Sequence, residues 1–127
     1  MAFLLLLCLI PIGYIAIPKG IPLGHKVVSR GVILASAYNS LPGQTDSSPW
    51  VTASGTRCRE GVIASNYFPI GTKIYIEGNK AVKGGVYTVE DRMNKRYHKK
   101  IDIWFRHYDD ARKFGVRKIK YYVLAAA

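Results

Sequence analysis

The chain has 127 residues, with 19 Lys or Arg against 8 Asp or Glu and a formal net charge of +11 at pH 7. This length leaves room for little more than one domain, and an apolar content of 49% is enough for its core. This positive charge indicates an anionic partner, such as nucleic acid, anionic lipid or an anionic wall polymer. The charge alone does not distinguish among these three. Two cysteines exclude a disulfide framework, and Cys58 is expected to be a small apolar filler.

The first seventeen residues predict an export segment. No charged residue occurs from Ala2 to Ile17, but the run is shorter than the roughly 20 apolar residues of a spanning helix and contains Pro11 and Gly13. We therefore expect a signal peptide or membrane anchor over 1–17, and an exported protein of the periplasm or cell envelope. A buried core helix is the alternative.

Proline, glycine and basic residues over 18–30 predict a linker, which places the folded domain at 31–127. Short β-type runs separated by turn residues then follow, namely Val32–Tyr38, Gly61–Ala64, Lys73–Glu77, Gly85–Glu90, Lys100–Phe105 and Arg117–Leu124. A helix is predicted over Tyr108–Phe114, which stops at Gly115. This pattern predicts a small all-β fold, a closed six-stranded barrel with one short helix, because an open sheet would leave long unpaired edges.

Two aspartates, Asp91 and Asp102, stand where apolar runs meet polar chain. Alternation in the second run places Asp102 and Trp104 on one face, with Lys100, and the apolar residues on the other. A carboxyl beside an indole suits sugar chemistry, because an apolar ring can stack on a pyranose and disfavour ionisation of its neighbour. The alternative is that both aspartates are ordinary strand-end or turn residues.

Several segments resemble the three-aspartate (3D) domain over nearly everything from Val32 to the end. They are Ala35-Ser36-Ala37-Tyr38-Asn39, Thr52-Ala53-Ser54-Gly55-Thr56, Val62-Ile63-Ala64-Ser65-Asn66, Pro69-Ile70-Gly71-Thr72-Lys73-Ile74, Val89-Glu90-Asp91, Ile101-Asp102-Ile103-Trp104-Phe105 and Ala111-Arg112-Lys113-Phe114-Gly115. The resemblance implies a double-psi β-barrel and lytic transglycosylase activity on peptidoglycan, as in membrane-bound lytic transglycosylase A. The Thr-Ala-Ser-Gly segment and the Pro-Ile-Gly-Thr turn are also similar to the rare lipoprotein A family, which acts on the same polymer.

The resemblance implies roles for individual residues. Asp102 falls on the third aspartate of the pattern, the acid and base of glycosidic cleavage, and Asp91 falls on the second. Asn66 stands where the pattern has its first aspartate, and an amide cannot move a proton at neutral pH. The chain also has Arg92-Met93-Asn94 where many members have a Thr-Gly-Gly turn.

Lytic cleavage lets one carboxyl act twice. The 6-hydroxyl of muramic acid attacks in place of water, so Asp102 can serve first as acid and then as base. We expect Asp91, supported by Asn66, to orient the sugar and to keep Asp102 protonated longer. Aromatic residues are candidate sugar platforms, with core packing as the alternative role: Tyr38, Trp50 and Trp104.

Basic residues crowd the stretch between the two aspartates. We expect Arg92 and Lys100 to be among those that hold carboxylates or phosphates of the wall, although a plain solvated loop is an equal alternative. The three histidines lack metal-ligand spacing with cysteines or acids, so no metal or other cofactor is expected.

The expected partner is a peptidoglycan glycan strand, bound by a monomer that the N-terminal segment could attach to a membrane. Two other classes remain open. The Asn66 departure motivates a peptidoglycan-binding module without activity. The charge alone permits a nucleic-acid-binding protein, although the export segment argues against nucleic acid as the partner.

Overall fold

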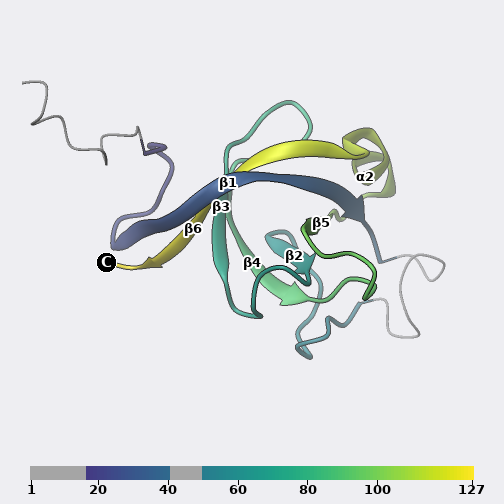
Figure 1. The fold of residues 1–127 in the computed structure, drawn as a ribbon. Helices are drawn as coiled ribbons and strands as arrows, with labels where there is room; N and C mark the ends of the chain where they lie inside the picture. The colour runs from purple at the N-terminus through teal and green to yellow at the C-terminus, as the bar shows by residue number, and fades with distance from the viewer. Residues whose placement is uncertain (1–16, 41–49) are drawn as a thin grey trace, which may run out of the picture.

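The computed structural model describes residues 17–40 and 50–127 (Figure 1). These residues form a closed barrel with the strand order β1-β5-β2-β4-β3-β6. The elements in chain order are β1 (His25–Tyr38), β2 (Val62–Ser65), β3 (Lys73–Ile76), β4 (Gly85–Asp91), β5 (Lys100–Trp104), α2 (Tyr108–Phe114) and β6 (Arg117–Ala126). The predicted small all-β barrel of six strands is therefore confirmed, as is the predicted helix.

Consecutive strands are interleaved in the barrel. β5 lies between β1 and β2, and β2 lies between β4 and β5. β1 pairs with β5 in parallel and β2 pairs with β4 in parallel, whereas β2 and β5 are antiparallel. The chain therefore crosses over β5 on its way from β1 to β2, and over β2 on its way from β4 to β5. This is the interleaving expected of a double-psi barrel.

The main core fills the inside of the barrel. Alternate residues of the strands point inward, so β-branched side chains from neighbouring strands meet there. Ile101 and Ile103 of β5 belong to this core and are at most 1% exposed, and Phe105 packs against it. The predicted alternation in the Lys100 to Phe105 run is confirmed, because Trp104 belongs to a different cluster.

A second cluster lies on the outer side of β1, β5 and β2. It consists of Tyr38, Cys58, Val62, Ala64 and Trp104, with Met93 packed against it. The chain before Cys58 folds back on itself through a bridge between Val51 and Arg57. Cys58 is 5% exposed and burial raises its pKa, which fits the predicted role of apolar filler.

β1 begins at His25, seven residues before the predicted start, so the linker expected over 18–30 is partly strand. Its first part pairs antiparallel with the end of β6, with His25 opposite Ala126 and Arg30 opposite Tyr122. Figure 1 shows the two strands running side by side away from the barrel. Most side chains in this part of β1 are exposed, so the sequence carries no clear apolar alternation there.

The predicted export segment, apart from Ile17, lies outside the described residues. Within residues 17–40 and 50–127, no helix has the length and apolar content needed to cross a membrane.

Candidate active site

Strand register brings the two predicted aspartates together. Asp102 of β5 lies opposite Ser36 of β1 on one side and opposite Ala64 of β2 on the other. Ala64 in turn lies opposite Asp91 of β4. Directly opposed residues point to the same side of a sheet, so these four residues form one row on the outer side of the barrel. Asp91 and Asp102 flank Ala64 with Cα atoms roughly 10 Å apart, which is two strand spacings.

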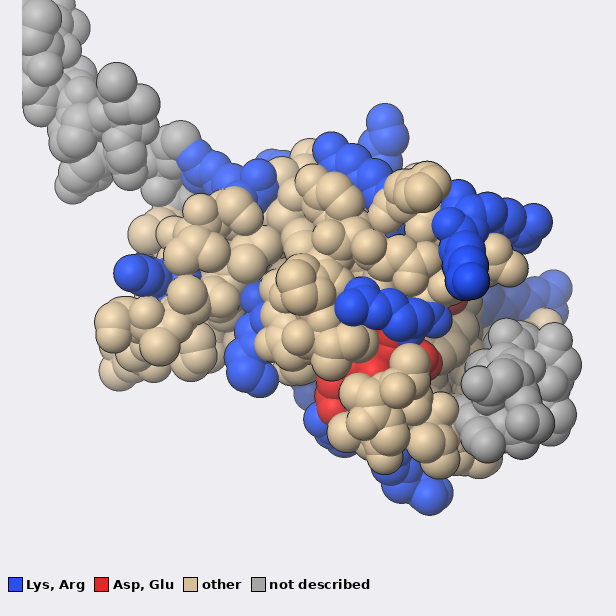
Figure 2. All heavy atoms as spheres, turned by 60° about the horizontal axis from the view of Figure 1, so that its bottom comes forward, with Lys and Arg blue, Asp and Glu red and all other residues tan. Residues whose placement is uncertain are grey.

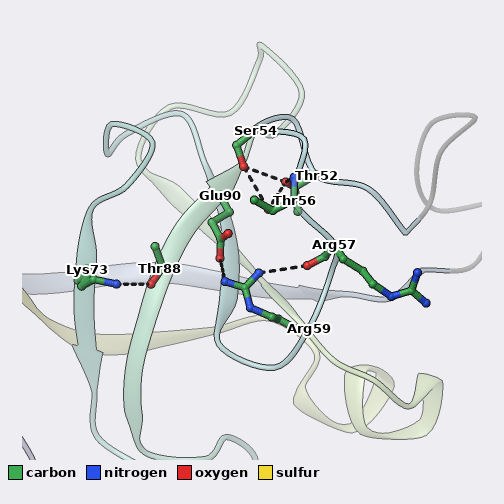
Figure 3. A network of polar contacts seen from close by, with 8 residues as sticks. All are labelled: Thr52, Ser54, Thr56, Arg57, Arg59, Lys73, Thr88 and Glu90. Carbon is green, nitrogen blue, oxygen red and sulfur yellow. Dashed lines mark hydrogen bonds and ion pairs between the residues drawn. The ribbon is translucent and has the colours of Figure 1, made fainter.

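A β-bulge in β4 selects which acid joins this row. Ile63 lies opposite Val89, but the next residue, Ala64, lies opposite Asp91. Glu90 is therefore the extra residue of the bulge, and its carboxylate makes an ion pair of 2.6 Å with Arg59 (Figure 3). Without the bulge, Glu90 would stand beside Ala64 and Asp91 would point to the other face.

The carboxyl of Asp102 is partly buried, and this burial raises its pKa to about 6. The Ser36 hydroxyl donates a hydrogen bond of 2.9 Å to Oδ1 of Asp102, and this bond lowers the pKa of Asp102. The positive charge of Lys100 lowers it as well. The negative charge of Asp91 raises the pKa further, in the direction expected from the sequence. Asp102 can therefore hold or release a proton near neutral pH.

Asp91 accepts three hydrogen bonds. Its Oδ1 accepts from the backbone N–H groups of Ala53 and Arg92, both at 2.9 Å, and its Oδ2 accepts from the Tyr38 hydroxyl at 3.2 Å. Burial and the carboxylate of Asp91 raise the pKa of Tyr38, so this phenol stays neutral. Asp91 thereby ties the chain before Cys58 to the end of β4, in a fixed position.

The turn that Asp91 holds is built by hydroxyl groups. The hydroxyls of Thr52, Ser54 and Thr56 lie within 2.7 to 3.2 Å of one another, and the Thr52 N–H donates to the Thr56 carbonyl. Figure 3 shows this turn beside Glu90, whose carbonyl accepts from the Ser54 N–H at 3.2 Å. The Thr-Ala-Ser-Gly-Thr segment therefore forms a compact cover next to the row of acids.

Asn66 holds the loop that follows β4. Its Nδ2 donates to the carbonyls of Met93, Asn94 and Tyr97 at 2.9 to 3.0 Å, and its Oδ1 accepts from the Met93 N–H at 3.2 Å. The described hydrogen bonds of this amide all go to backbone groups, and none goes to Asp91. These bonds give Asn66 a structural role in shaping the loop, and its expected role in binding substrate stays a prediction.

The two basic residues chosen from the sequence differ in position. Arg92 donates from Nη1 to the carbonyls of Ser65 and Phe68 at 2.7 and 2.8 Å, so one end of its guanidinium serves the loop. Lys100 places its ammonium 4.4 Å from the ring centroid of Tyr97 and lowers the pKa of Asp102. Lys100 is therefore the basic residue whose charge acts directly on the candidate acid.

The predicted sugar platforms are mostly buried. Trp104 is 2% exposed and donates from Nε1 to the Ser40 hydroxyl at 2.9 Å, and Tyr38 is 8% exposed. Both rings pack in the second cluster, so their predicted role as stacking surfaces is corrected to core packing. Trp50 is 42% exposed and lies edge-on to Trp104, with ring centroids 6.2 Å apart. It is the indole that a sugar could reach.

Two groups at this site were missed in the sequence. Ser36 donates to Asp102, and the Ala53 N–H donates to Asp91. Ser36 belongs to the quoted Ala-Ser-Ala-Tyr segment, but its role depends on the parallel pairing of β1 with β5, which local patterns do not encode. The Ala53 contact comes from backbone and has no signature in residue type.

A shallow hollow of about 340 Å³ lies beside the loop, lined by Asn66, Tyr67, Phe68, Pro69 and Arg92. Asp102 lies outside this lining. Figure 2 shows Lys and Arg spread over one face of the molecule, with acidic atoms gathered near its middle. No group of three metal-ligating side chains occurs in the described ranges.

No protein-family model matches this chain, and no curated protein matches it.

Proposed function

We propose that the protein is a peptidoglycan lytic transglycosylase that cleaves the β-1,4 bond between N-acetylmuramic acid and N-acetylglucosamine during wall turnover in the cell envelope. The observation that supports this most is the Asp102 carboxyl, which is partly buried and has a pKa raised to about 6. A general acid must be protonated when it acts, and a pKa of about 6 leaves roughly one Asp102 carboxyl in ten protonated at pH 7, far more than at the ordinary pKa of an aspartate.

In the proposed reaction, protonated Asp102 donates its proton to the glycosidic oxygen as the bond from that oxygen to the muramic acid C1 breaks. Positive charge develops on the sugar ring, and the 6-hydroxyl of the same muramic acid attacks C1. The Asp102 carboxylate accepts the proton of that hydroxyl. The acid is thereby regenerated, no water is consumed, and the product carries a 1,6-anhydro ring.

Asp91 has a different role in this proposal. Its oxygens already accept from two backbone N–H groups and one phenol, so it is a fixed negative charge instead of a proton carrier. From its place in the same row, that charge favours the protonated form of Asp102 and the developing positive charge of the sugar. Ser36 is a positioning residue, because it orients the carboxyl of Asp102.

The charge of the molecule supports a polymer of opposite sign as substrate. The net charge of +11 favours binding to a wall polymer that carries peptide carboxylates. Lys99 and Arg96 lie over the rings of Tyr67 and Tyr97, at 5.9 and 4.8 Å from the centroids. These cation and ring pairs lie in and beside the loop that precedes Asp102, where stem peptides of a bound strand would pass.

The test is mass spectrometry of the soluble products released from purified sacculi by the full chain and by Asp102→Asn. We expect anhydro-muropeptides from the wild type and a loss of at least about 100-fold in the variant, the usual contribution of a general acid. Asp109→Asn is the matched control, because it makes the same chemical change on an exposed residue of α2. Unchanged release by Asp102→Asn, or products with ordinary reducing ends, would contradict the proposal.

The second candidate is a peptidoglycan-binding module without catalytic activity. It is favoured by the hydrogen bonds of Asn66 and Asp91, which go to backbone groups and, for Asp91, also to the Tyr38 hydroxyl, so both side chains have structural roles. Co-sedimentation with sacculi separates the two candidates. Binding with no anhydro product supports the module, whereas retention on DNA at about physiological salt without binding to sacculi would support the nucleic-acid alternative.

A further inference from the structure

A second pocket, of about 560 Å³, lies at another part of the barrel. It is formed by the connection between β3 and β4, the chain just before β2, the start of β4, and the segment from the end of β5 into α2. Figure 1 shows the β3–β4 connection and α2 on the same upper side of the barrel. Trp104 lines this pocket but Asp91 and Asp102 do not, so the pocket does not contain the two aspartates of the candidate active site.

The rim of this pocket is basic. Lys80, Lys83, Arg106 and Lys113 line it together with two acids, Glu60 and Asp110. Within the described ranges, the one ion pair joins Arg59 and Glu90, so these four cations have no carboxylate within 4.0 Å there. Four positive charges against two negative ones leave an excess that attracts an anion.

The wall of the pocket is apolar, and hydrogen bonds fix the chain segment that forms it. Val82, Tyr87 and Phe105 contribute apolar surface. The Asn79 side chain accepts from the N–H groups of Ala81 and Val82 at 2.7 and 3.0 Å. The Tyr87 hydroxyl donates to the Lys83 carbonyl at 2.6 Å. These bonds fix the β3–β4 connection, so the pocket is formed before any ligand arrives.

Two glycines bring the ends of this connection together. A Cβ atom on Gly84 would lie 2.7 Å from the Gly78 nitrogen, and one on Gly78 would lie 2.6 Å from the Gly84 nitrogen. The backbone can approach this closely only because neither residue has a side chain. The resulting turn carries Lys80 and Lys83, which both line the pocket.

We infer that this pocket binds a small organic anion. The carboxylate or phosphate group of the ligand lies against the lysines and Arg106, and its apolar body covers the wall formed by Val82 and Phe105. The volume is in the range of pockets that enclose small ligands, which are commonly apolar with a few fixed polar groups. This inference is independent of the transglycosylase proposal.

The test uses 8-anilinonaphthalene-1-sulfonate, an aromatic anion whose fluorescence rises in apolar sites, and its neutral analogue N-phenyl-1-naphthylamine. We expect saturable binding of the anion at one site per chain and weaker binding of the neutral analogue. Displacement by phenyl phosphate or by hippurate then shows whether phosphate or carboxylate is preferred. Equal affinity for the neutral analogue would contradict an anion site.

Two triple variants locate the binding. Lys80→Gln with Lys83→Gln and Arg106→Gln should weaken binding of the anionic probe about tenfold, as expected for the loss of three exposed charged contacts. Lys26→Gln with Lys118→Gln and Lys120→Gln removes the same charge from exposed positions of β1 and β6, and should change affinity by less than about twofold.

The outcomes separate cleanly. If both triple variants bind the anionic probe equally weakly, the net charge of the protein explains the weakening, and the proposal of an anion site in this pocket is contradicted. No weakening in the pocket variant, or no saturable binding by the wild type, would overturn it as well. Thermal melts followed by circular dichroism verify that each variant is folded. If the pocket variant is not, the exposed single variants Lys83→Gln and Lys113→Gln replace it, with Lys118→Gln as the control. We expect at least about twofold weakening in each pocket variant and no change in the control, and equal affinities in all three would overturn the site.

Discussion

The environment of Asp102 has two opposing effects on the pKa of its carboxyl. Burial disfavours its charge, while the Ser36 hydroxyl and the Lys100 ammonium favour it, and burial is the larger effect. The balance leaves the pKa at about 6 instead of driving it far higher, as an unpaired buried carboxyl would be driven. A carboxyl with this pKa changes protonation within the pH range in which the fold can be studied.

The stability of the fold should therefore depend on the Asp102 proton. The pKa of Asp102 is about 6 in the folded protein and about 3.9 in an unfolded chain. The folded protein therefore binds this proton more tightly than the unfolded chain does, and the resulting contribution to the free energy of unfolding is fully present below pH 4 and is lost as pH rises through 6. Between pH 4 and pH 7 the wild type should lose about 2 to 3 kcal/mol relative to Asp102→Asn. Urea unfolding at several pH values measures this difference, with Asp109→Asn as the control for an exposed acid.

A parallel course of the wild-type and Asp102→Asn stabilities from pH 4 to pH 7 would contradict a raised pKa at this residue. It would also remove the main support for Asp102 as the general acid.

Ser36→Ala should move the pKa of Asp102 upward. The hydroxyl donates to the ionised carboxylate, so its loss favours the protonated form and should raise the pKa by about one pH unit. Carbon-13 NMR titration of the aspartate carboxyl groups measures this change directly. Ser29→Ala, on an exposed part of β1, is the matched control. An unchanged or lower pKa in Ser36→Ala would show that the hydrogen bond does not act on Asp102 in solution.

At the scale of elements, the loop after β4 depends on one amide. Asn66 donates to three carbonyls, which is a task that only a donor side chain can perform. Asn66→Asp, which introduces the aspartate that the three-aspartate pattern has at this position, places a carboxylate against those three oxygens. We expect it to lower the free energy of unfolding by about 2 to 4 kcal/mol at pH 7, measured by urea unfolding.

Asn94→Asp is the control for this change. Asn94 lies in the same loop, but its Oδ1 accepts from the Arg96 N–H, and a carboxylate can do the same. The control should therefore stay within about 0.5 kcal/mol of the wild type. An Asn66→Asp variant that is as stable as the control would show that the loop does not depend on the three hydrogen bonds that this amide donates.

Local sequence patterns predicted the strands and the helix better than they predicted which strands pair with one another. The period of two in Lys100–Trp104 and the turn residue Gly115 were sufficient for β5 and for the end of α2. The bulge at Glu90, which places Asp91 in the row, comes from a register shift between β2 and β4 that residue types do not mark. The contact between Ser36 and Asp102 likewise depends on a parallel pairing of distant segments.

At the scale of the whole molecule, the closed barrel must be stable in spite of a large positive net charge. A net charge of +11 opposes compaction through self-repulsion, so the barrel relies on its apolar interior and on continuous strand pairing. β6 closes the barrel by pairing with β1 on one side and β3 on the other. The longest antiparallel ladder in this closure runs between β1 and β6, and its first part was expected to be linker.

Removal of that first part tests its contribution to stability. A chain that starts at Gly31 loses the pairs from His25 to Arg30 with β6, but it keeps those from Gly31 to Ala35, so the barrel should still close. We expect it to be about 1 to 3 kcal/mol less stable than a chain that starts at Pro18, because several ladder hydrogen bonds and the cover over Tyr122 are lost. Urea unfolding of the two chains at the same salt concentration measures the difference. Equal stability would mean that His25 to Arg30 act only as a tether, as the sequence alone predicted.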